Sequence, residues 1–448
     1  MDSPGQTIDD FSLVTGLRKT AQIDGTFYLN DTPTFLHGAN WTDYMPFPID
    51  RYEQPKDVTT DWLVRTLQSL KAINGNVLRV RHQHKVNKEV LLSLCDQLGV
   101  LVIYQTDASV QPWQTDMEEL QQTIHQYKHH PSILMWQGAD DLEFNSYTQD
   151  AQVWMDRYHK NIRLADTTRL IALTGVRPNF GTSGTPNDEG TRLYDANYNR
   201  YRLLRNAGSW LADDVVRVGN DPTLSYGADW NNLRTFPISS LWDTLRSNYL
   251  NSQQHLYIDV HSEGMAGQEN PLTVKGSPYR YSESYASPYI RPMLETELVF
   301  EDWIVTQAWQ GFTAYEAYRK KRWLGYDGLL WGALMNGGDP TALLDAEGYL
   351  KLAARMCKMA AQPTLAGSFS TDVAYSKGET IPVFLTHIGN SRRSASVQIT
   401  VKNVVGEVLQ RKTLAVQNLT SGNTTVLAGE WVSTIDEAGW YLVEYEVR

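Results

Sequence analysis

Short runs of apolar residues alternate along most of this chain with longer stretches in which apolar positions recur at helical spacing. The short runs are typical of strands in a parallel sheet, and the longer stretches are typical of amphipathic helices that cover it. Strands are predicted at Phe35–Trp41, Asn76–Val80, Val100–Tyr104, Ile133–Trp136, Leu170–Thr174, Val215–Val218, Leu256–Val260 and Gly328–Trp331. Helices are predicted at Thr60–Ile73, Lys88–Leu98, Asp116–Tyr127, Asp150–Leu164, Ile238–Leu250, Glu295–Arg322 and Tyr349–Ala361. Eight strands in such alternation predict an α/β fold, the (β/α)8 TIM barrel.

The pattern changes after Pro363, where short alternating runs are separated by Gly, Asn and Ser turns. Short alternating strands joined by such turns predict a small immunoglobulin-like β-sandwich. We therefore expect a barrel over residues 21–362 and a sandwich over 363–448, with residues 1–20 ahead of the barrel. Long loops rich in Gly, Pro and Asn are expected at 175–208 and 264–291, over the barrel mouth.

Composition excludes several classes of protein. The net charge of −11, with no cluster of Lys and Arg, argues against a nucleic-acid partner. No apolar stretch is long enough to span a bilayer, and the polar N-terminus is not a signal peptide. Cys95 and Cys357 lie in apolar helical stretches, so neither a disulfide nor a zinc site is expected from them. The 14 Trp and 24 Tyr suit contact with sugar rings, although core packing uses such residues equally well.

Two of the predicted strands lead directly into acidic residues. The strand ending at Trp136 continues as Gln-Gly-Ala-Asp-Asp up to Asp141, and the strand ending at Val260 continues as His-Ser-Glu-Gly, with the acid at Glu263. In a TIM barrel the carboxyl ends of the strands form the catalytic face. A pair of carboxylates on this face is the chemistry that glycoside hydrolysis requires.

Six segments from about Val14 onward follow one another in the order found in a known family. They are Val14-Thr-Gly-Leu-Arg-Lys, Phe27-Tyr-Leu-Asn-Asp with Phe35-Leu-His-Gly-Ala-Asn-Trp, Asn76-Val-Leu-Arg-Val-Arg-His, Cys95-Asp-Gln-Leu-Gly-Val-Leu-Val, Ser262-Glu-Gly and Gly328-Leu-Leu-Trp. Together they resemble glycoside hydrolase family 2, nearest to its β-mannosidase and exo-glucosaminidase branch. The first segment resembles the family's hinge, so residues 1–20 are expected to be the tail of a preceding domain that this chain lacks. The resemblance implies a retaining β-glycosidase that needs no cofactor.

The resemblance also implies catalytic roles. Glu263, in the Ser-Glu-Gly motif, is expected to be the nucleophile. The family's fourth-strand motif ends in Asn-Glu, with the Glu as acid/base, whereas this chain has Asp140 and Asp141. By its position Asp141 is expected to be the acid/base, although its side chain is one methylene shorter than that of the family's Glu. Glu143 is the alternative acid. Asp140 is expected at the substrate, where its charge would raise the pKa of its neighbour.

Further substrate-binding residues are expected at the ends of the other strands. Arg79 would hold the nucleophile ionised or bind the sugar, or else form a surface ion pair. Trp136 and Trp331 would form the floor beneath the sugar, or equally belong to the core. The His-X-His of His82 and His84 lacks a companion ligand, so no metal is expected there. The remaining members of the predicted substrate-binding set are Asn40, Trp41, His82 and His261.

Three readings of function stay open at this point. The first is a retaining, exo-acting β-glycosidase that removes terminal β-linked mannose, galactose, glucuronate or glucosamine from oligo- or polysaccharides. The second is a catalytically impaired barrel that binds carbohydrate or acts as a scaffold, which the Asp-Asp pair favours. The third is an endo-acting or transglycosylating enzyme. Family analogy favours an extracytoplasmic location, and the sequence predicts no oligomeric state.

Overall fold

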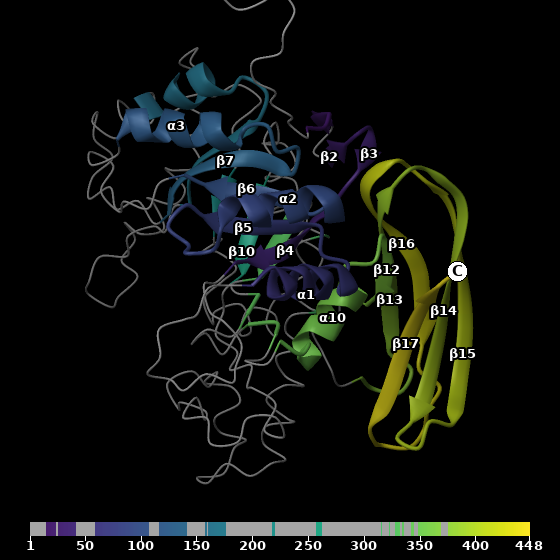
Figure 1. Ribbon diagram of the computed structural model, residues 1–448. Helices are drawn as coiled ribbons and strands as arrows, with labels where there is room; N and C mark the ends of the chain where they lie inside the picture. Colours follow the sequence, from purple (N-terminus) through teal and green to yellow (C-terminus); the bar gives the residue numbers. More distant parts are fainter. Residues whose placement is uncertain are drawn as a thin grey trace, which may run out of the picture.

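A computed structural model of the protein describes the eight barrel strands and most of the C-terminal part of the chain (Figure 1). The described residues are 15–23, 26–41, 59–106, 116–140, 157–158, 160–175, 217–219, 257–261, 315, 322, 328–331, 334–335, 342–344, 348–368 and 375–448. The expected loops at 175–208 and 264–291 lie outside them, apart from residue 175. So do the predicted helix at Ile238–Leu250 and most of those at Asp150–Leu164 and Glu295–Arg322.

Eight parallel strands form one sheet, in the order β8-β7-β6-β5-β4-β11-β10-β9. Their bounds are β4 Leu36–Asn40, β5 Val77–Arg81, β6 Leu101–Gln105, β7 Ile133–Asp140, β8 Leu170–Gly175, β9 Arg217–Gly219, β10 Tyr257–His261 and β11 Gly328–Trp331. The two outermost strands of this order, β8 and β9, pack against each other and close the ring. Neighbours in sequence are therefore neighbours around the ring, which is the TIM barrel that the hydrophobic pattern predicts.

Four helices of the barrel are described: α1 Thr60–Ala72, α2 Lys88–Leu98, α3 Met117–Tyr127 and α10 Leu352–Ala360. Local chemistry explains where they begin and end. The side chains of Thr59, Asn87 and Asp116 each accept a hydrogen bond from a backbone N–H of the first turn of α1, α2 and α3. Gly99 ends α2 in the left-handed conformation, with φ of 65°. These bounds agree with the predicted helices to within three residues.

Alternate residues of the strands face two separate cores. The outer core joins the strands to the helices and includes Leu78, Tyr104 and Leu67. The inner core fills the amino-terminal half of the barrel and consists of Phe27, Leu36, Val77, Ile103, Leu134, Met135 and Leu330. Successive side chains of a strand point to opposite faces. The core to which one residue of a strand belongs therefore shows whether each other side chain of that strand faces the barrel interior or the helices.

A small antiparallel sheet, which the sequence pattern did not predict, precedes the barrel. Its strands are β1 Thr20–Ile23, β2 Thr26–Leu29 and β3 Thr32–Pro33. Asn30 and Asp31 turn the chain between β2 and β3 with positive φ angles of 49° and 61°, as a tight hairpin requires. Phe27 of β2 enters the inner core, so this sheet closes the amino-terminal end of the barrel.

The C-terminal part consists of two three-stranded antiparallel sheets, β12-β13-β16 and β15-β14-β17. The strands are β12 Thr364–Gly367, β13 Thr380–Gly389, β14 Arg392–Asn403, β15 Val408–Leu419, β16 Gly422–Val432 and β17 Tyr441–Val447. Inward residues of both sheets, among them Val383, Val397 and Trp431, share one core. Figure 1 shows this unit beside the barrel, close to α10 and the small sheet.

Cys95 and Cys357 are both buried free thiols, as expected. Among the described residues, no helix is long and apolar enough to cross a membrane.

Candidate active site

A layer of polar side chains lies above the inner core, toward the carboxyl ends of the strands. Arg79, Gln105 and Gln137 each stand two positions after an inner-core residue of β5, β6 or β7, and Asn40 ends β4. Alternation directs these four side chains into the barrel. Arg79, Gln105 and Gln137 are at most 4% exposed. A layer of amides and one guanidinium therefore lies inside the barrel near the carboxyl ends of its strands.

Two amide oxygens hold the Arg79 guanidinium in place. Its Nε donates to Oε1 of Gln137 at 2.6 Å, and its Nη2 donates to Oε1 of Gln105 at 3.2 Å. Hydrogen bonds from a charged donor are stronger than neutral ones, and two acceptors fix the plane of the group. Arg79 therefore presents a fixed positive charge inside the barrel. At 4% exposure it lies inside the barrel, and not at the surface where the alternative role would place it.

Two atoms of this layer carry unused hydrogen-bonding capacity. Within the described part of the chain, Nε2 of Gln137 and Oδ1 of Asn40 are buried without a hydrogen-bond partner. Such atoms are few in native proteins, and each one calls for an explanation. A donor and an acceptor at the strand ends of a barrel are suited to a polyhydroxylated ligand.

The predicted catalytic carboxylates follow described strand ends. Asp140 is the last residue of β7, where its backbone pairs with Gly175 of β8. His261 is the last residue of β10, in register with Trp331 of β11. Asp141, Glu143 and Glu263 lie outside the described residues. Since all the strands are parallel, the carboxyl ends of β7 and β10 lie at the same end of the barrel.

Trp136 and Trp331 belong to the outer core, at 0% and 1% exposure. The indole N–H of Trp136 donates to Oδ2 of Asp166 at 2.8 Å, and Arg169 lies over the ring. Asp166 stands ahead of β8, at the end of the strands opposite to the polar layer. Strand alternation therefore points both indoles toward the helices. The expectation that they form the floor beneath the sugar is wrong, and their alternative assignment as core residues holds.

Burial of Asp166 disfavours its charged form. Hydrogen bonds from Thr168 and Trp136, with the charge of Arg169, outweigh this effect and lower the pKa of Asp166 to about 2.

Trp41 and His82 also turn away from the barrel interior. Trp41 is 3% exposed in the outer core. Nδ1 of His82 lies 3.0 Å from the hydroxyl of Tyr104, an outer-core residue whose pKa burial raises. The two residues follow Asn40 and Arg81 by one position, and in a strand one position changes the face. Of the predicted substrate-binding set, Asn40 and Arg79 have described side chains that face the interior.

Gln105 and Gln137 are functional candidates that the sequence reasoning missed. Each is a polar residue at the end of a predicted apolar strand, and Arg79 was selected because it is a polar residue near the end of such a strand. In a sequence, a neutral amide at a strand end is a weaker signal than a charge, although an amide supplies both a donor and an acceptor.

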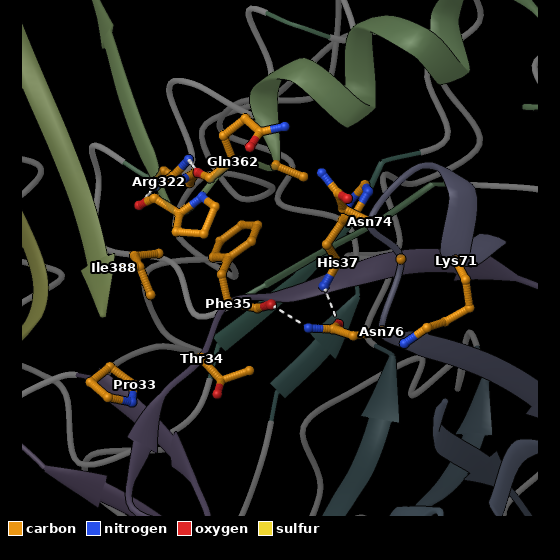
Figure 2. A pocket seen from close by; sticks show the side chains of 13 residues that line it. Pro33, Thr34, Phe35, His37, Lys71, Asn74, Asn76, Arg322, Gln362 and Ile388 are labelled. Atoms are coloured by element: carbon orange, nitrogen blue, oxygen red, sulfur yellow. Dashed lines mark hydrogen bonds between the residues drawn. The ribbon is translucent and has the colours of Figure 1, made fainter. Parts of the chain in front are cut away.

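A cavity of about 470 Å³ lies at the amino ends of β4 and β5, beside the C-terminal sheets. Its lining includes Phe35, His37, Asn76, Arg322 and Ile388. Figure 2 shows Arg322 and Gln362 on one side of it and His37 and Asn76 on the other. This end of the barrel is opposite to the polar layer, so the cavity is separate from the candidate active site.

A closed ring of eight parallel strands defines the class of TIM-barrel proteins. Within that class, residues 21–223 match the protein-family model described as "Glycosyl hydrolases family 2, TIM barrel domain". This region of the chain is therefore similar to the TIM barrel domain of glycosyl hydrolase family 2, in agreement with the resemblance of the six segments.

Curated relatives agree with this assignment. The chain is 26% identical over 309 residues to a β-mannosidase from goat (Capra hircus), a match that covers 61% of this chain and 33% of the goat protein. It is 24% identical over 178 residues to a β-glucuronidase from pig (Sus scrofa), covering 38% of this chain and 26% of the pig protein. The matched regions thus span about a third or less of these relatives.

Solved structures show the same fold. A β-D-mannosidase from Dictyoglomus thermophilum superposes with a TM-score of 0.61 at 14% identity, covering all of this chain and 53% of the other. An exo-chitosanase from Amycolatopsis orientalis gives a TM-score of 0.58 at 12% identity, covering 97% of this chain and 50% of the other. At such identities the likeness concerns the fold alone.

Proposed function

We propose that the protein is a retaining β-glycosidase that acts on terminal β-linked sugars, with Glu263 as nucleophile and Asp141 as acid/base. The observation that carries this proposal is the fixed Arg79 guanidinium within the amide layer at the carboxyl end of a family 2 barrel. The two acids follow β7 and β10, whose carboxyl ends lie at that same end of the barrel. The curated relatives act on β-mannosides and β-glucuronides, which supports a β-linked sugar as substrate.

In the proposed reaction the Glu263 carboxylate attacks the anomeric carbon while Asp141 donates its proton to the departing glycosidic oxygen. A covalent glycosyl–enzyme ester forms, and the aglycone leaves as an alcohol. Asp141, now ionised, then takes a proton from water, whose oxygen attacks the anomeric carbon and releases Glu263. Two inversions return the original anomeric configuration.

The amide layer has a role of its own in this mechanism. Nε2 of Gln137 and Oδ1 of Asn40 would bind sugar hydroxyl groups, which satisfies both buried atoms when the substrate is present. The positive charge of Arg79 would favour ionised carboxylates at the catalytic face. The barrel holds the two amides and the guanidinium in place before the substrate binds, so neither the hydrogen bonds nor the charge requires rearrangement during the reaction.

The shorter Asp141 is compatible with slower chemistry. Its carboxyl group is retracted relative to that of Glu, and a misplacement of about 1 Å costs on the order of a hundredfold in rate. Glu143 in the following segment is the alternative donor. A catalytically impaired barrel that only binds carbohydrate is the second candidate function, and the Asp-Asp pair is the observation that favours it.

Aryl β-glycosides separate the two functions, because an activated phenol leaves without full protonation. We expect the wild-type chain to hydrolyse one of the 4-nitrophenyl β-mannoside, glucuronide, glucosaminide and galactoside. The variant Glu263→Gln should lose activity by about four orders of magnitude. Glu118→Gln, an exposed carboxylate on α3, is the matched control and should retain it.

A second variant identifies the acid/base. Asp141→Ala should accumulate the glycosyl–enzyme, and azide should restore turnover with formation of a β-glycosyl azide. If Glu143→Gln gives this result and Asp141→Ala does not, Glu143 is the acid/base. If no glycoside is hydrolysed while sugars still bind, the binding function replaces the catalytic one.

We also infer the division of the chain. Residues 21–362 form the catalytic barrel, residues 363–448 form an immunoglobulin-like sandwich, and residues 1–20 form a hinge. The inference is supported by the start of β12 at Thr364, directly after α10, and by the separate core of the two C-terminal sheets.

A further inference from the structure

A cluster of metal-ligand side chains lies outside the ring of strands. Glu89 stands in the first turn of α2, and His129 and His130 lie in the turn between α3 and β7. One ligand atom from each residue lies within 4.8 Å of the others. The polar layer of the candidate active site faces the barrel interior and shares no residue with this cluster.

The spacing of the three ligand atoms suits one ion. Nε2 of His130 lies 3.4 Å from Oε1 of Glu89, and Nε2 of His129 lies 3.6 Å from the same oxygen. Around a tetrahedral zinc ion with bonds of about 2.0–2.1 Å, neighbouring ligand atoms are about 3.4 Å apart. Both nitrogens therefore lie at nearly the distance from Oε1 of Glu89 that a bound site requires, and all three ligand atoms lie within 4.8 Å of one another.

His130 is oriented as a ligand. Its Nδ1 lies 2.7 Å from Oδ2 of Asp96, whose other oxygen accepts the backbone N–H of Ser132 at 2.8 Å. A histidine that donates Nδ1–H to a carboxylate directs the lone pair of Nε2 at the metal, and such carboxylate–histidine pairs support most zinc sites. Asp96 and Glu89 lie seven positions apart on α2, and therefore on one face of the helix.

The surroundings of His130 provide an independent observation that points to a ligand. Nε2 of His130 is buried, in a side chain that is 3% exposed, and has no hydrogen-bond partner in the described part of the chain. It faces a carboxylate oxygen, which is also an acceptor. Two lone pairs at this distance repel each other unless a metal ion or a proton lies between them.

The backbone that carries the two histidines is fixed from several sides. The hydroxyl of Thr15 donates to the carbonyl of His129, Arg18 donates to the carbonyl of Pro131, and Arg169 donates to the carbonyl of His130. Such support preorganises the ligands, which lowers the conformational entropy that binding would cost.

We propose that Glu89, His129 and His130 bind a divalent transition-metal ion of the zinc class, which ties α2 to the turn between α3 and β7. Two imidazoles and one carboxylate form a donor set that suits zinc. Glu89 is 54% exposed at its side chain, so water can complete the fourth position.

Zinc titration of the full chain, after dialysis against a chelator, tests the proposal. We expect calorimetry with ZnCl2 to give one site per chain and the thermal midpoint to rise with zinc. The variants His129→Asn and Glu89→Gln should each weaken binding at least about tenfold. His125→Asn removes an exposed histidine of α3 outside the cluster and should bind zinc like the wild type.

Cobalt provides a second readout, since four-coordinate Co2+ absorbs visible light strongly. The wild type and His125→Asn should show this absorption with CoCl2, and His129→Asn should not. Equal zinc binding by all variants would mean adventitious ions only. Absence of zinc binding in the wild type would mean that hydrogen bonds and ion pairs alone hold the cluster together, and either result overturns the proposal.

Discussion

At the scale of single residues, the direction of each strand side chain decides its role. Arg79 and Gln137 face the barrel interior, whereas Trp136, one position away from Gln137, faces the helices. Arg79 and Trp136 were both selected from the sequence as residues near strand ends. A single position of register separates a candidate for substrate binding from a core residue.

His37 is a buried residue of β4 whose neutral form the fold requires. Burial lowers its pKa to about 4, and nearby Arg322 adds to the shift, while the hydrogen bond to the carbonyl of Ile73 opposes it. In the unfolded chain the pKa is about 6.5. Because the folded pKa is depressed, the unfolded state binds more protons between pH 6.5 and 4, and stability falls as the pH is lowered through this window.

We therefore expect the wild type to lose up to about 3 kcal/mol of unfolding free energy through His37 between about pH 6.5 and 4. The variant His37→Gln keeps a side-chain N–H donor for Ile73 but does not titrate. Urea denaturation at a series of pH values should show a shallower slope for the variant in this window. Parallel slopes for the two proteins would contradict the prediction.

At the scale of elements, capping explains the helix bounds, and one buried arginine explains how α10 ends. Arg322, at 2% exposure, donates to the backbone carbonyls of Ala360, Gln362 and Pro363. The carbonyl of Ala360, the last residue of α10, lies at the negative end of the helix dipole, and the other two carbonyls follow the helix. Burial lowers the pKa of Arg322 to about 10, which leaves it charged at neutral pH.

The variant Arg322→Met should lower the free energy of unfolding by about 3 kcal/mol, because it leaves the carbonyls at the end of α10 without a charged donor. Chemical denaturation monitored by circular dichroism measures the loss. Arg411→Met, at an exposed position of β15, is the matched control and should change stability by less than about 0.5 kcal/mol. Equal effects of the two substitutions would exclude a capping role for Arg322.

At the scale of the whole molecule, the small N-terminal sheet joins the barrel to the C-terminal sheets. Phe27 of β2 enters the inner core of the barrel, while Oγ1 of the adjacent Thr26 accepts the backbone N–H of Asn423 at 3.0 Å. Gly422 precedes Asn423 with φ of 112°, and a Cβ there would lie 3.2 Å from Oγ1 of Thr26. The contact therefore depends on a glycine.

The variant Gly422→Ala should destabilise the protein more than Gly406→Ala does. Both glycines have positive φ, at 112° and 89°, so both substitutions strain the backbone, but a Cβ at Gly406 meets nothing within 4 Å. The additional loss for Gly422→Ala, of about 1 kcal/mol, reports the crowding against Thr26. Equal midpoints in urea would show that this contact contributes nothing to stability.

How much of the molecule was predictable differs between its parts. The eight strands and four described helices follow from apolar periodicity and caps, since these signals are local. The small sheet β1–β3 was missed, because strands of two to four residues leave too short a pattern. In the candidate site, Asn40 and Arg79 were selected from their places at strand ends. Gln105 and Gln137 were not, because an amide acquires its role from the guanidinium beside it.

The sequence by itself determined the alternation of strands and helices, the change of texture after Pro363 and the family resemblance, which residues 21–223 confirm. Only the tertiary structure decided which strand residues face the interior. It also decided which polar groups meet across elements: Arg79 with Gln137, Arg322 with α10, and Glu89 with His129 and His130. The physical reason is that periodicity is encoded between neighbours in sequence, whereas these contacts form between segments that only the closed barrel brings together.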